Sequence, residues 1–206
     1  MDNINVRVEC NPGFVYSTSP ILIYGEAAVG KTLAALALAS WTAARHGTRV
    51  ALITTEPQST LPSASLLLPK DSAIYIAYSL EELVDVAIDA VKSAGPLDVI
   101  VVDTINGPYR VEVATNPDVA NRLLAFTAAL LRRSTERGVA VIALAQVHVD
   151  PDTGAEEPPG YTLIAPYFTY RLRLVRRGHV RIALGAEGEV FKLIVGGGRV
   201  VIRCTL

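Results

Sequence analysis

An eight-residue segment, GEAAVGKT (25–32), constrains the fold of this chain more than any other stretch of its sequence. The apolar run PILIY stands directly before it and is typical of a buried strand. Residues 31–46 overlap its end, are rich in Ala and Leu, and predict a helix. A strand, a glycine-containing loop and a helix in this order are typical of an α/β protein, so we expect the loop to lie at one edge of a sheet.

The rest of the first 160 residues continues the alternation of strand and helix. Short apolar runs predict four further strands, at 49–55, 72–78, 97–103 and 139–146. The proline- and serine-rich stretch 57–69 is expected to be a loop. Continuous apolar strands that alternate with helices predict a mostly parallel sheet covered on both faces.

Two further helices have clear start signals. Ser79 and Glu82 form a capping box before a helix over residues 80–94. Asn116 followed by Pro117 predicts the start of a helix that runs to about Arg137.

After Gly160 the pattern changes to alternating apolar and polar residues. It predicts two antiparallel hairpins that extend the sheet, with turns near 177–178 and 196–198. We therefore expect a single domain over residues 1–206, with a short N-terminal extension (1–19) and C-terminal antiparallel strands (161–206).

The net charge of −1 conceals an uneven distribution. Residues 1–160 carry 11 Lys/Arg and 18 Asp/Glu, a balance of −7, whereas residues 161–206 carry 8 and 2, a balance of +6. The basic segment fits either contact with nucleic acid or arginines that point to solvent from antiparallel strands. Its arginines are Arg171, Arg173, Arg176, Arg177, Arg181, Arg199 and Arg203.

Neither a transmembrane span nor a signal peptide is indicated. Charges or glycines interrupt the apolar stretches, and the first residues lack a basic start followed by an apolar core. We therefore expect a cytoplasmic protein without membrane contact. Cys10 and Cys204 are the only cysteines, and buried thiols are favoured over a disulfide between them.

Residues 25–32 fit the phosphate-binding pattern Gly-x4-Gly-Lys-Thr in full. The glycines allow backbone N–H groups to point at phosphate oxygens, Lys31 reaches the β/γ-phosphates, and the Thr32 hydroxyl coordinates Mg²⁺. No lysine stands in an Asn/Thr-Lys-x-Asp element of the GTPase type, so ATP is favoured over GTP. The expected nucleotide-binding residues are Gly25, Glu26, Ala27, Ala28, Val29, Gly30, Lys31, Thr32 and Leu33.

Two carboxylates follow at predicted strand ends. Asp103 ends the run LDVIVVD, where a second group on Mg²⁺ is expected, although a strand-end aspartate need not hold a metal. Glu56 ends the run RVALITTE, whose strand is expected beside the phosphate-loop strand. There the Glu56 carboxylate could orient an attacking water. A loop carboxylate that only caps a helix or is exposed to solvent is an equally good interpretation of this residue.

At this point the chain resembles the ATPase core of the RecA/RadA recombinases, most of all the short archaeal paralogue RadB. The resemblance rests on YGEAAVGKT, ITTEP, VVDTINGPYRVEV, NRLLAFTAALLRRSTERGVAVIALAQV and the strands beyond, and covers roughly residues 20–205. It implies a RecA-like P-loop NTPase core, with a mostly parallel central sheet flanked by helices and extended by C-terminal antiparallel hairpins.

The resemblance also implies roles for particular residues. Lys31 and Glu56 would be catalytic, with Glu56 activating water. Asp103 would hold Mg²⁺ through water, and the Asp103–Thr104 peptide bond would be cis. Gln146 would sense the γ-phosphate and open the second DNA loop, although a polar residue that merely ends a strand is the alternative.

The implied contacts with DNA are less specific. Tyr109 and Arg110 fall where the family's first DNA loop begins. The second loop, HVDPDTGAEEPPGY (148–161), is acidic, so binding to phosphate backbones is expected to be weak, with single strands favoured. The candidate DNA contacts are Arg110, Arg171, Arg173, Arg176 and Arg177.

Other features depart from the family pattern. Only about 20 residues precede the first core strand, where full recombinases carry a DNA-binding domain. No arginine follows Glu56 to stack on adenine. Phe126 and Ala129 match the spacing of the family's polymerisation motif, but we expect both to be core residues of an amphipathic helix.

The leading functional interpretation is an ATP-binding, slowly hydrolysing ATPase accessory to homologous recombination and DNA repair. Its partners would be DNA and the main recombinase or another repair protein, and it could form homo-oligomers. The alternative is a KaiC-like, ATP-gated interaction module that touches no DNA. A small-molecule kinase is disfavoured, because the long loop at 147–160 holds no arginine for a lid.

Overall fold

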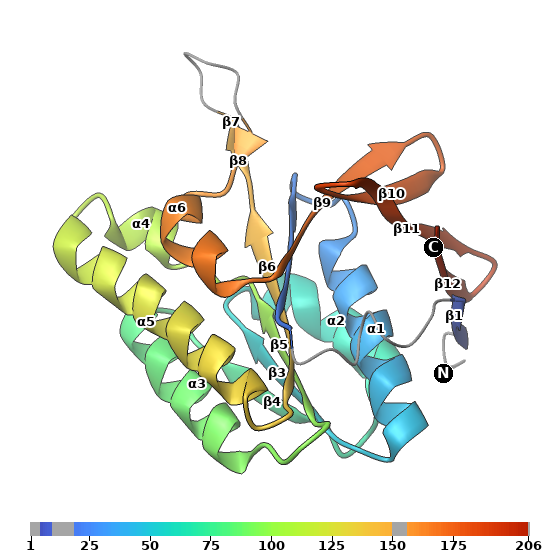
Figure 1. Ribbon diagram of the computed structural model, residues 1–206, viewed down its shortest axis with the longest axis horizontal. Coiled ribbons are helices and arrows are strands. Elements are labelled where there is room, and N and C mark those ends of the chain that lie inside the picture. Colours follow the sequence, from blue (N-terminus) through green and yellow to red (C-terminus); the bar gives the residue numbers. More distant parts are fainter. Residues whose placement is uncertain (1–4, 10–18, 150–155, 206) are drawn as a thin grey trace.

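The structure is a computed structural model that describes residues 5–9, 19–149 and 156–205 (Figure 1). In this part of the chain, ten strands form one sheet in the order β1-β12-β11-β10-β9-β2-β6-β5-β3-β4. Helices cover the central strands on both sides (Figure 1). The prediction of a mostly parallel, helix-flanked sheet with C-terminal antiparallel strands is confirmed.

Six neighbouring strands run parallel and form one end of the sheet, with β4 at its edge. In β2, β3, β5 and β6 the apolar side chains are buried on both faces, which explains why their sequence runs do not alternate, whereas Ile74 and Ile76 of β4 are exposed. The carboxyl ends of the six strands share one edge, where Gly25 pairs with Gln146 and Thr54 with Asp103. The strands are β9 (Tyr170–Arg177), β2 (Ile21–Gly25), β6 (Ala140–Gln146), β5 (Val99–Asp103), β3 (Val50–Thr54) and β4 (Ala73–Ile76).

The expectation that the Glu56 strand lies beside the phosphate-loop strand is wrong. The strands β6 and β5 lie between β2 and β3. Both arrive later in the chain, and β5 pairs with β3 while β6 pairs with β2. Local sequence carries no signal for such an insertion, because every strand of a covered parallel sheet is similarly apolar.

Two helices cover each face of the parallel strands (Figure 1). On one face lie α1 (Lys31–His46) and α2 (Pro57–Leu67), and on the other lie α3 (Leu80–Ser93) and α5 (Pro117–Thr135). The bounds of α1 are those predicted from its Ala- and Leu-rich pattern. The caps of α3 and α5 are also confirmed, since each N-cap side chain accepts a backbone N–H of the first turn.

Helix α2 occupies the stretch that was expected to be a loop. Pro57 lies in its first turn, where a proline has no intrahelical N–H bond to lose. Thr60, Ala64 and Leu67 are buried at helical spacing, and Ala64 and Leu67 belong to the same apolar core as the buried residues of α1. The two prolines, of which Pro62 lies inside the helix, hid this pattern in the sequence.

The C-terminal strands extend the sheet as antiparallel hairpins. β9 is followed by β10 (Val180–Gly185), β11 (Gly188–Gly196) and β12 (Arg199–Cys204), each antiparallel to the one before. β1 (Asn5–Glu9) comes from the other end of the chain and pairs parallel with β12. The stretch expected to be a mere extension therefore contributes the edge strand of the sheet.

Short elements surround the edge where the parallel strands end. Helix α4 (Tyr109–Glu112) follows β5, and the ribbon of β7 (His148–Val149) and β8 (Glu156–Glu157) follows β6. Helix α6 (Tyr161–Ile164) and the 3-10 turn η2 (Ala165–Tyr167) lead back to β9. Residues 150–155 of the expected second DNA loop lie outside the described residues.

The expectation that Phe126 is a core residue is wrong, because its side chain is 50% exposed. The buried stripe of α5 runs instead through Leu124, Ala128 and Leu131. Phe126 lies about 160° from Leu124 and from Ala128 around the helix, since two residues turn it by about 200°. Ala129 is half-buried.

The preference for free thiols is also wrong, since Cys204 is disulfide-bonded. Cys10, the other cysteine of the sequence, lies outside the described residues. Among the helices that the structure describes, none has the length and apolar character needed to cross a membrane.

Candidate functional site

A cavity opens at the carboxyl edge of the parallel strands, next to the start of α1. It receives residues from the 25–32 loop, from the end of β3, from α2 and from the ends of β5 and β6. Its lining residues are Ala27, Ala28, Gly30, Lys31, Thr32, Leu33, Glu56, Ser59, Ser63, Asp103, Thr104 and Gln146.

The 25–32 loop has a backbone that explains its small residues. A Cβ on Gly25 would lie 2.4 Å from the carbonyl oxygen of Leu174 in β9, so the close approach of these strands requires glycine. Gly30 is the N-cap of α1 with a φ of 103°, a region that favours glycine. Ala28 also has a positive φ, of 58°, and is strained because it carries a Cβ.

Lys31 is folded against its own loop. Its Nζ donates to the carbonyl oxygens of Gly25 at 2.8 Å and Glu26 at 2.6 Å. Burial lowers the pKa of Lys31, while the nearby carboxylates of Asp103 and Glu56 oppose that shift. The ammonium is therefore held at the loop, in a partly desolvated place where its charge acts strongly.

Asp103 lies at the end of β5 and is almost fully buried. Its Oδ2 accepts hydrogen bonds from the hydroxyls of Thr32 at 2.7 Å and Thr60 at 2.9 Å. Burial raises the pKa of Asp103, and the two hydroxyls and Lys31 oppose the shift. The Asp103–Thr104 peptide bond is cis, which confirms the prediction made from the resemblance.

Thr60 was missed in the sequence because it stands in the stretch expected to be a loop. Its spacing of four residues from Glu56 places both at the start of α2, near the same edge of the sheet. Had 57–67 been recognised as a helix, the buried spacing of Thr60, Ala64 and Leu67 would have pointed to this hydroxyl.

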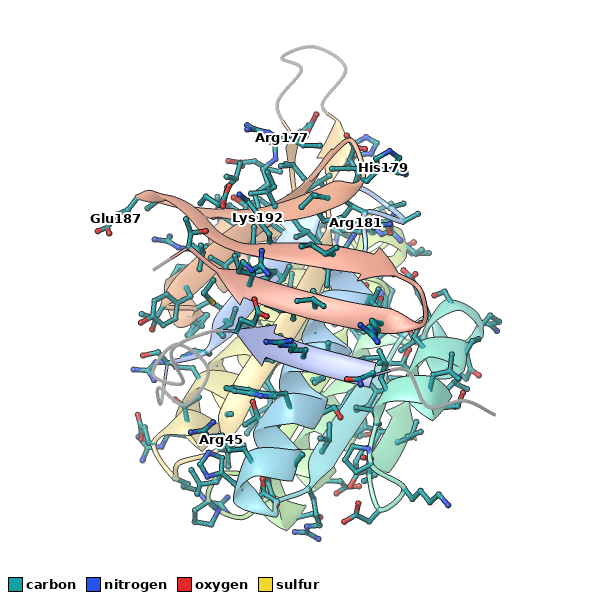
Figure 2. All side chains as sticks on the ribbon, turned by 90° about the vertical axis from the view of Figure 1, so that its right-hand side faces the viewer. Arg45, Arg177, His179, Arg181, Glu187 and Lys192 are labelled. Atoms are coloured by element: carbon teal, nitrogen blue, oxygen red, sulfur yellow. The ribbon has the colours of Figure 1, made fainter. Side chains whose placement is uncertain are left out.

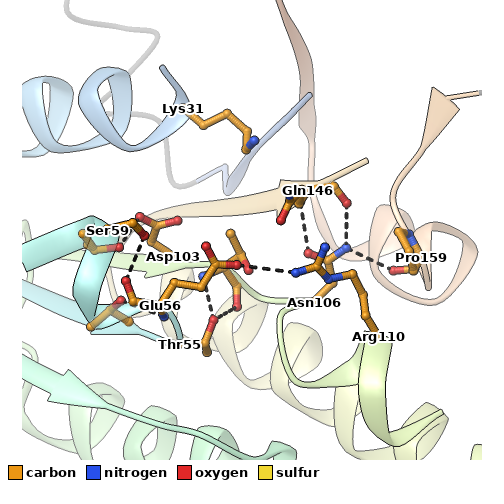
Figure 3. Close-up of polar contacts among 12 residues, drawn as sticks. Lys31, Thr55, Glu56, Ser59, Asp103, Asn106, Arg110, Gln146 and Pro159 are labelled. Atoms are coloured by element: carbon orange, nitrogen blue, oxygen red, sulfur yellow. Dashed lines mark hydrogen bonds and ion pairs between the residues drawn. The ribbon is translucent and has the colours of Figure 1, made fainter. Parts of the chain in front are cut away.

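Glu56 lies between the end of β3 and α2, where it is the N-cap residue. Its Oε1 lies 3.6 Å from a guanidinium nitrogen of Arg110 in α4, and both side chains are partly exposed (Figure 3). Although β6 and β5 separate β3 from β2, the Glu56 carboxylate still lines the cavity that holds Lys31. Arg110 thus reaches the site through Glu56, without lining the cavity itself.

Gln146 is held in place through its main chain. The Asn106 Nδ2 donates to the Gln146 carbonyl oxygen at 3.0 Å, and the Gln146 N–H donates to Asn106 Oδ1 at 3.1 Å (Figure 3). Asn106 also donates to the Pro159 carbonyl oxygen at 3.4 Å, and its side chain is fully buried. Asn106 was not singled out in the sequence, where a polar residue three positions after Asp103 was the only signal.

The remaining DNA candidates do not meet at this cavity. Arg171 and Arg173 line a separate hollow, and Arg173 forms an ion pair with Glu156 of β8. Arg176 and Arg177 are exposed at the end of β9. Four of the five candidate DNA contacts, Arg171, Arg173, Arg176 and Arg177, therefore share the strand β9 and lie outside the Lys31 cavity.

Tyr109 does not lie at an open surface. It is almost fully buried in α4, and its hydroxyl donates to Asn121 of α5 at 2.9 Å. This places Tyr109 in the packing between α4 and α5, whereas its neighbour Arg110 points toward Glu56 (Figure 3).

The strand order, the loop between β2 and α1, and Asp103 at the end of β5 together define a RecA-like α/β fold. No protein-family model matches the chain, and no curated protein matches it. Among solved structures, the chain is similar to the crystal structure of the RadB recombinase, with a TM-score of 0.65 and 20% sequence identity. The similarity covers 96% of this chain and 98% of that one, so the two share their fold along nearly their whole lengths.

Proposed function

We propose that this chain is an ATP-binding, slowly hydrolysing ATPase that is accessory to homologous recombination and DNA repair. One observation carries the proposal: Lys31, Thr32, Glu56, Asp103 and Gln146 come from four separate segments and line one cavity. A parallel sheet gathers strand ends at one edge whatever their chemistry. These five, however, are the residue types that positioning and neutralising a transferred phosphate require.

The loop and its first helical turn would bind the nucleotide. Backbone N–H groups at the start of α1 and the Lys31 ammonium would hold the β- and γ-phosphates. Thr32 and Asp103, whose oxygens are 2.7 Å apart, would hold Mg²⁺, which supplies positive charge against the phosphates when bound. A cation there would favour the charged form of Asp103 and so offset the effect of its burial.

The other two residues would act on the attacking water and the γ-phosphate. Glu56 would accept a proton from the water, and Arg110 would orient its carboxylate from the far side. Gln146 would lie at the γ-phosphate, with Asn106 fixing its backbone. Among the described residues no arginine lines this cavity, so we expect slow turnover without the roughly 10³–10⁵-fold gain of an arginine finger.

The role in recombination rests on the fold shared with the RadB recombinase and on the arginines of β9. Contact with DNA would be weak. Glu156 already neutralises Arg173, and Glu157 lies beside it on β8. Each arginine lost to an internal ion pair reduces the number of phosphates that the protein can neutralise.

The test is ATP hydrolysis by the purified protein, with and without a single-stranded oligonucleotide, beside a Lys31→Ala variant. We expect slow turnover that the oligonucleotide stimulates, and none in the variant. Absence of ATP binding in the wild type would refute the proposal. Binding without turnover, or turnover indifferent to DNA, would favour an ATP-gated interaction module instead.

A further inference from the structure

Arg181 of β10 lies beside the phosphate loop, although 150 positions of sequence separate it from Lys31. Its Nε is 3.6 Å, and its Cδ 3.9 Å, from the point where a Cβ on Gly30 would lie. The Leu193 side chain of β11 approaches the same point to 3.5 Å. Arg181, which is labelled in Figure 2, and Leu193 are directly paired across the strands, so both project from the same face of the sheet, and both lie beside Gly30 at the N-terminus of α1.

The Nε of Arg181 is buried and has no hydrogen-bond partner among the residues that the structure describes. Within the described ranges the guanidinium also has no ion-pair partner. An unpaired buried donor is unfavourable, and more so on a charged group, so such a group in a folded protein requires an explanation. A ligand that accepts hydrogen bonds and carries negative charge would provide one.

The neighbour of Arg181 across the hairpin strengthens this argument. Arg176 of β9 is directly opposite, and like charges in directly opposed positions destabilise a sheet. Arg176 lines a hollow together with Glu26 and Val29 of the phosphate loop. Arg181 and Arg176 thus both lie beside the phosphate loop, where a bound anion would reduce their repulsion beyond what Glu26 and Glu156 in the Arg176 hollow provide.

We infer that Arg181 is a nucleotide-binding residue, which contacts the phosphate chain of a nucleoside triphosphate held by the 25–32 loop. The inference rests on the proposed function, because it takes the loop's ligand to be a nucleotide. Arg181 lies beside the loop and outside the lining of the Lys31 cavity. Turning its terminal torsions would bring the planar guanidinium over Gly30, since the side chain already passes beside that residue.

Helix α2 supplies no positive charge to the cavity. That helix presents only Ser59 and Ser63 to the cavity after Glu56. In this chain the positive charge next to the nucleotide would come from the C-terminal sheet instead. A binding residue on β10 would couple nucleotide occupancy to the packing of the hairpins, which the loop alone would not do.

The test is a titration with a fluorescent ATP analogue and, in parallel, with adenosine. Arg181→Met keeps most of the aliphatic stem that packs by Leu193 and removes the guanidinium. We expect it to weaken ATP binding by roughly 10- to 100-fold, the equivalent of one charge-assisted hydrogen bond, and to leave adenosine binding unchanged. Arg181→Lys keeps the charge but not the planar fork, so its affinity for ATP should lie between those of the wild type and Arg181→Met.

The matched control is Arg199→Met at the start of β12. It removes the same charge from an exposed arginine of the same sheet. It should bind ATP within about twofold of the wild type, and a thermal melt of each variant checks that it is folded.

The outcomes separate this inference from the proposed function. If the wild type binds no ATP, both are overturned. If the wild type binds, Lys31→Ala does not, and both Arg181 variants bind as the wild type does, only the role of Arg181 is overturned. Unchanged ATP binding with weaker binding to a single-stranded oligonucleotide would likewise overturn it and assign Arg181 to a nucleic-acid surface.

Discussion

Asn106 offers a sharp test of how the site is held together, through the substitution Asn106→Ala. Its fully buried side chain makes hydrogen bonds of 3.0 and 3.1 Å to the carbonyl and N–H of Gln146, and a longer one to Pro159. Each short bond contributes about 1 kcal/mol, and a main-chain group left unpaired in the interior costs about 1–3 kcal/mol. We therefore expect Asn106→Ala to lower the free energy of unfolding by about 2–5 kcal/mol.

The measurement is denaturant unfolding followed by circular dichroism, in which the midpoint shifts while the slope stays constant. For a chain of this size the loss corresponds to a fall in Tm of roughly 5–15 °C. The control is Asn121→Ala, which removes the acceptor of the single hydrogen bond donated by the Tyr109 hydroxyl and should be milder, at about 1 kcal/mol. At a temperature where Asn106→Ala is folded, turnover should fall while ATP binding persists, because only the Gln146 backbone is released. Equal stability of the two variants would refute the idea that Asn106 anchors Gln146.

Three further predictions test separate parts of the structure. Glu56→Gln should retain ATP binding, and its turnover in a steady-state assay should fall by about 100-fold or more, since an amide cannot accept the water's proton. Hydrolysis at the wild-type rate would show that Glu56 has no catalytic role. Ala28→Gly should raise the free energy of unfolding by up to about 1 kcal/mol, because it relieves a positive φ, whereas Ala27→Gly should lower it; changes of the same sign in both variants would contradict the strain at Ala28. Burial alone would raise the pKa of Asp98. The Asp98 carboxylate, however, accepts hydrogen bonds from the backbone N–H groups of Arg49 and Gly95 and from the Arg49 guanidinium. These bonds outweigh the effect of burial and lower the pKa of Asp98 below 3.8. The stabilisation by the Asp98 carboxylate is therefore present above pH 3.8 and lost as pH falls through the lowered pKa. Asp98→Asn should lower the Tm at pH 7, and its Tm should converge with that of the wild type in acid. The control is Asp85→Asn at an exposed position of α3, which should change the Tm at pH 7 little.

Much of the fold could be predicted because its signals are local. The strand runs, the bounds of α1 and the N-caps of α3 and α5 depend on periodicity and on hydrogen bonds within a few residues. The failures share a cause in the tertiary structure. Prolines at 57 and 62 suggested a loop, but packing against α1 stabilises a helix there. Phe126 fitted an apolar stripe, yet the buried face of α5 follows its contacts with the sheet and α3.

The residues of the candidate site also divide into those that the sequence predicted and those that only the tertiary structure revealed. The phosphate loop was evident in the sequence, since eight consecutive residues carry the whole pattern. Thr60 and Asn106 were not, because a polar residue in a helix or a loop gains its meaning only from the group that it reaches. Arg181 is the extreme case, as only the pairing of β10 with β9 and β11 places it beside Gly30.

By itself, the sequence determined the α/β class, the loop that faces the sheet edge, and the residue types available there. Only the tertiary structure decided that β5 and β6 separate β2 from β3, that Thr32 and Asp103, 71 positions apart, share a hydrogen bond, and that Asn106 holds Gln146. The reason is physical: periodicity and capping are energies of neighbours in the chain, whereas strand order and side-chain meetings depend on the packing of the whole core.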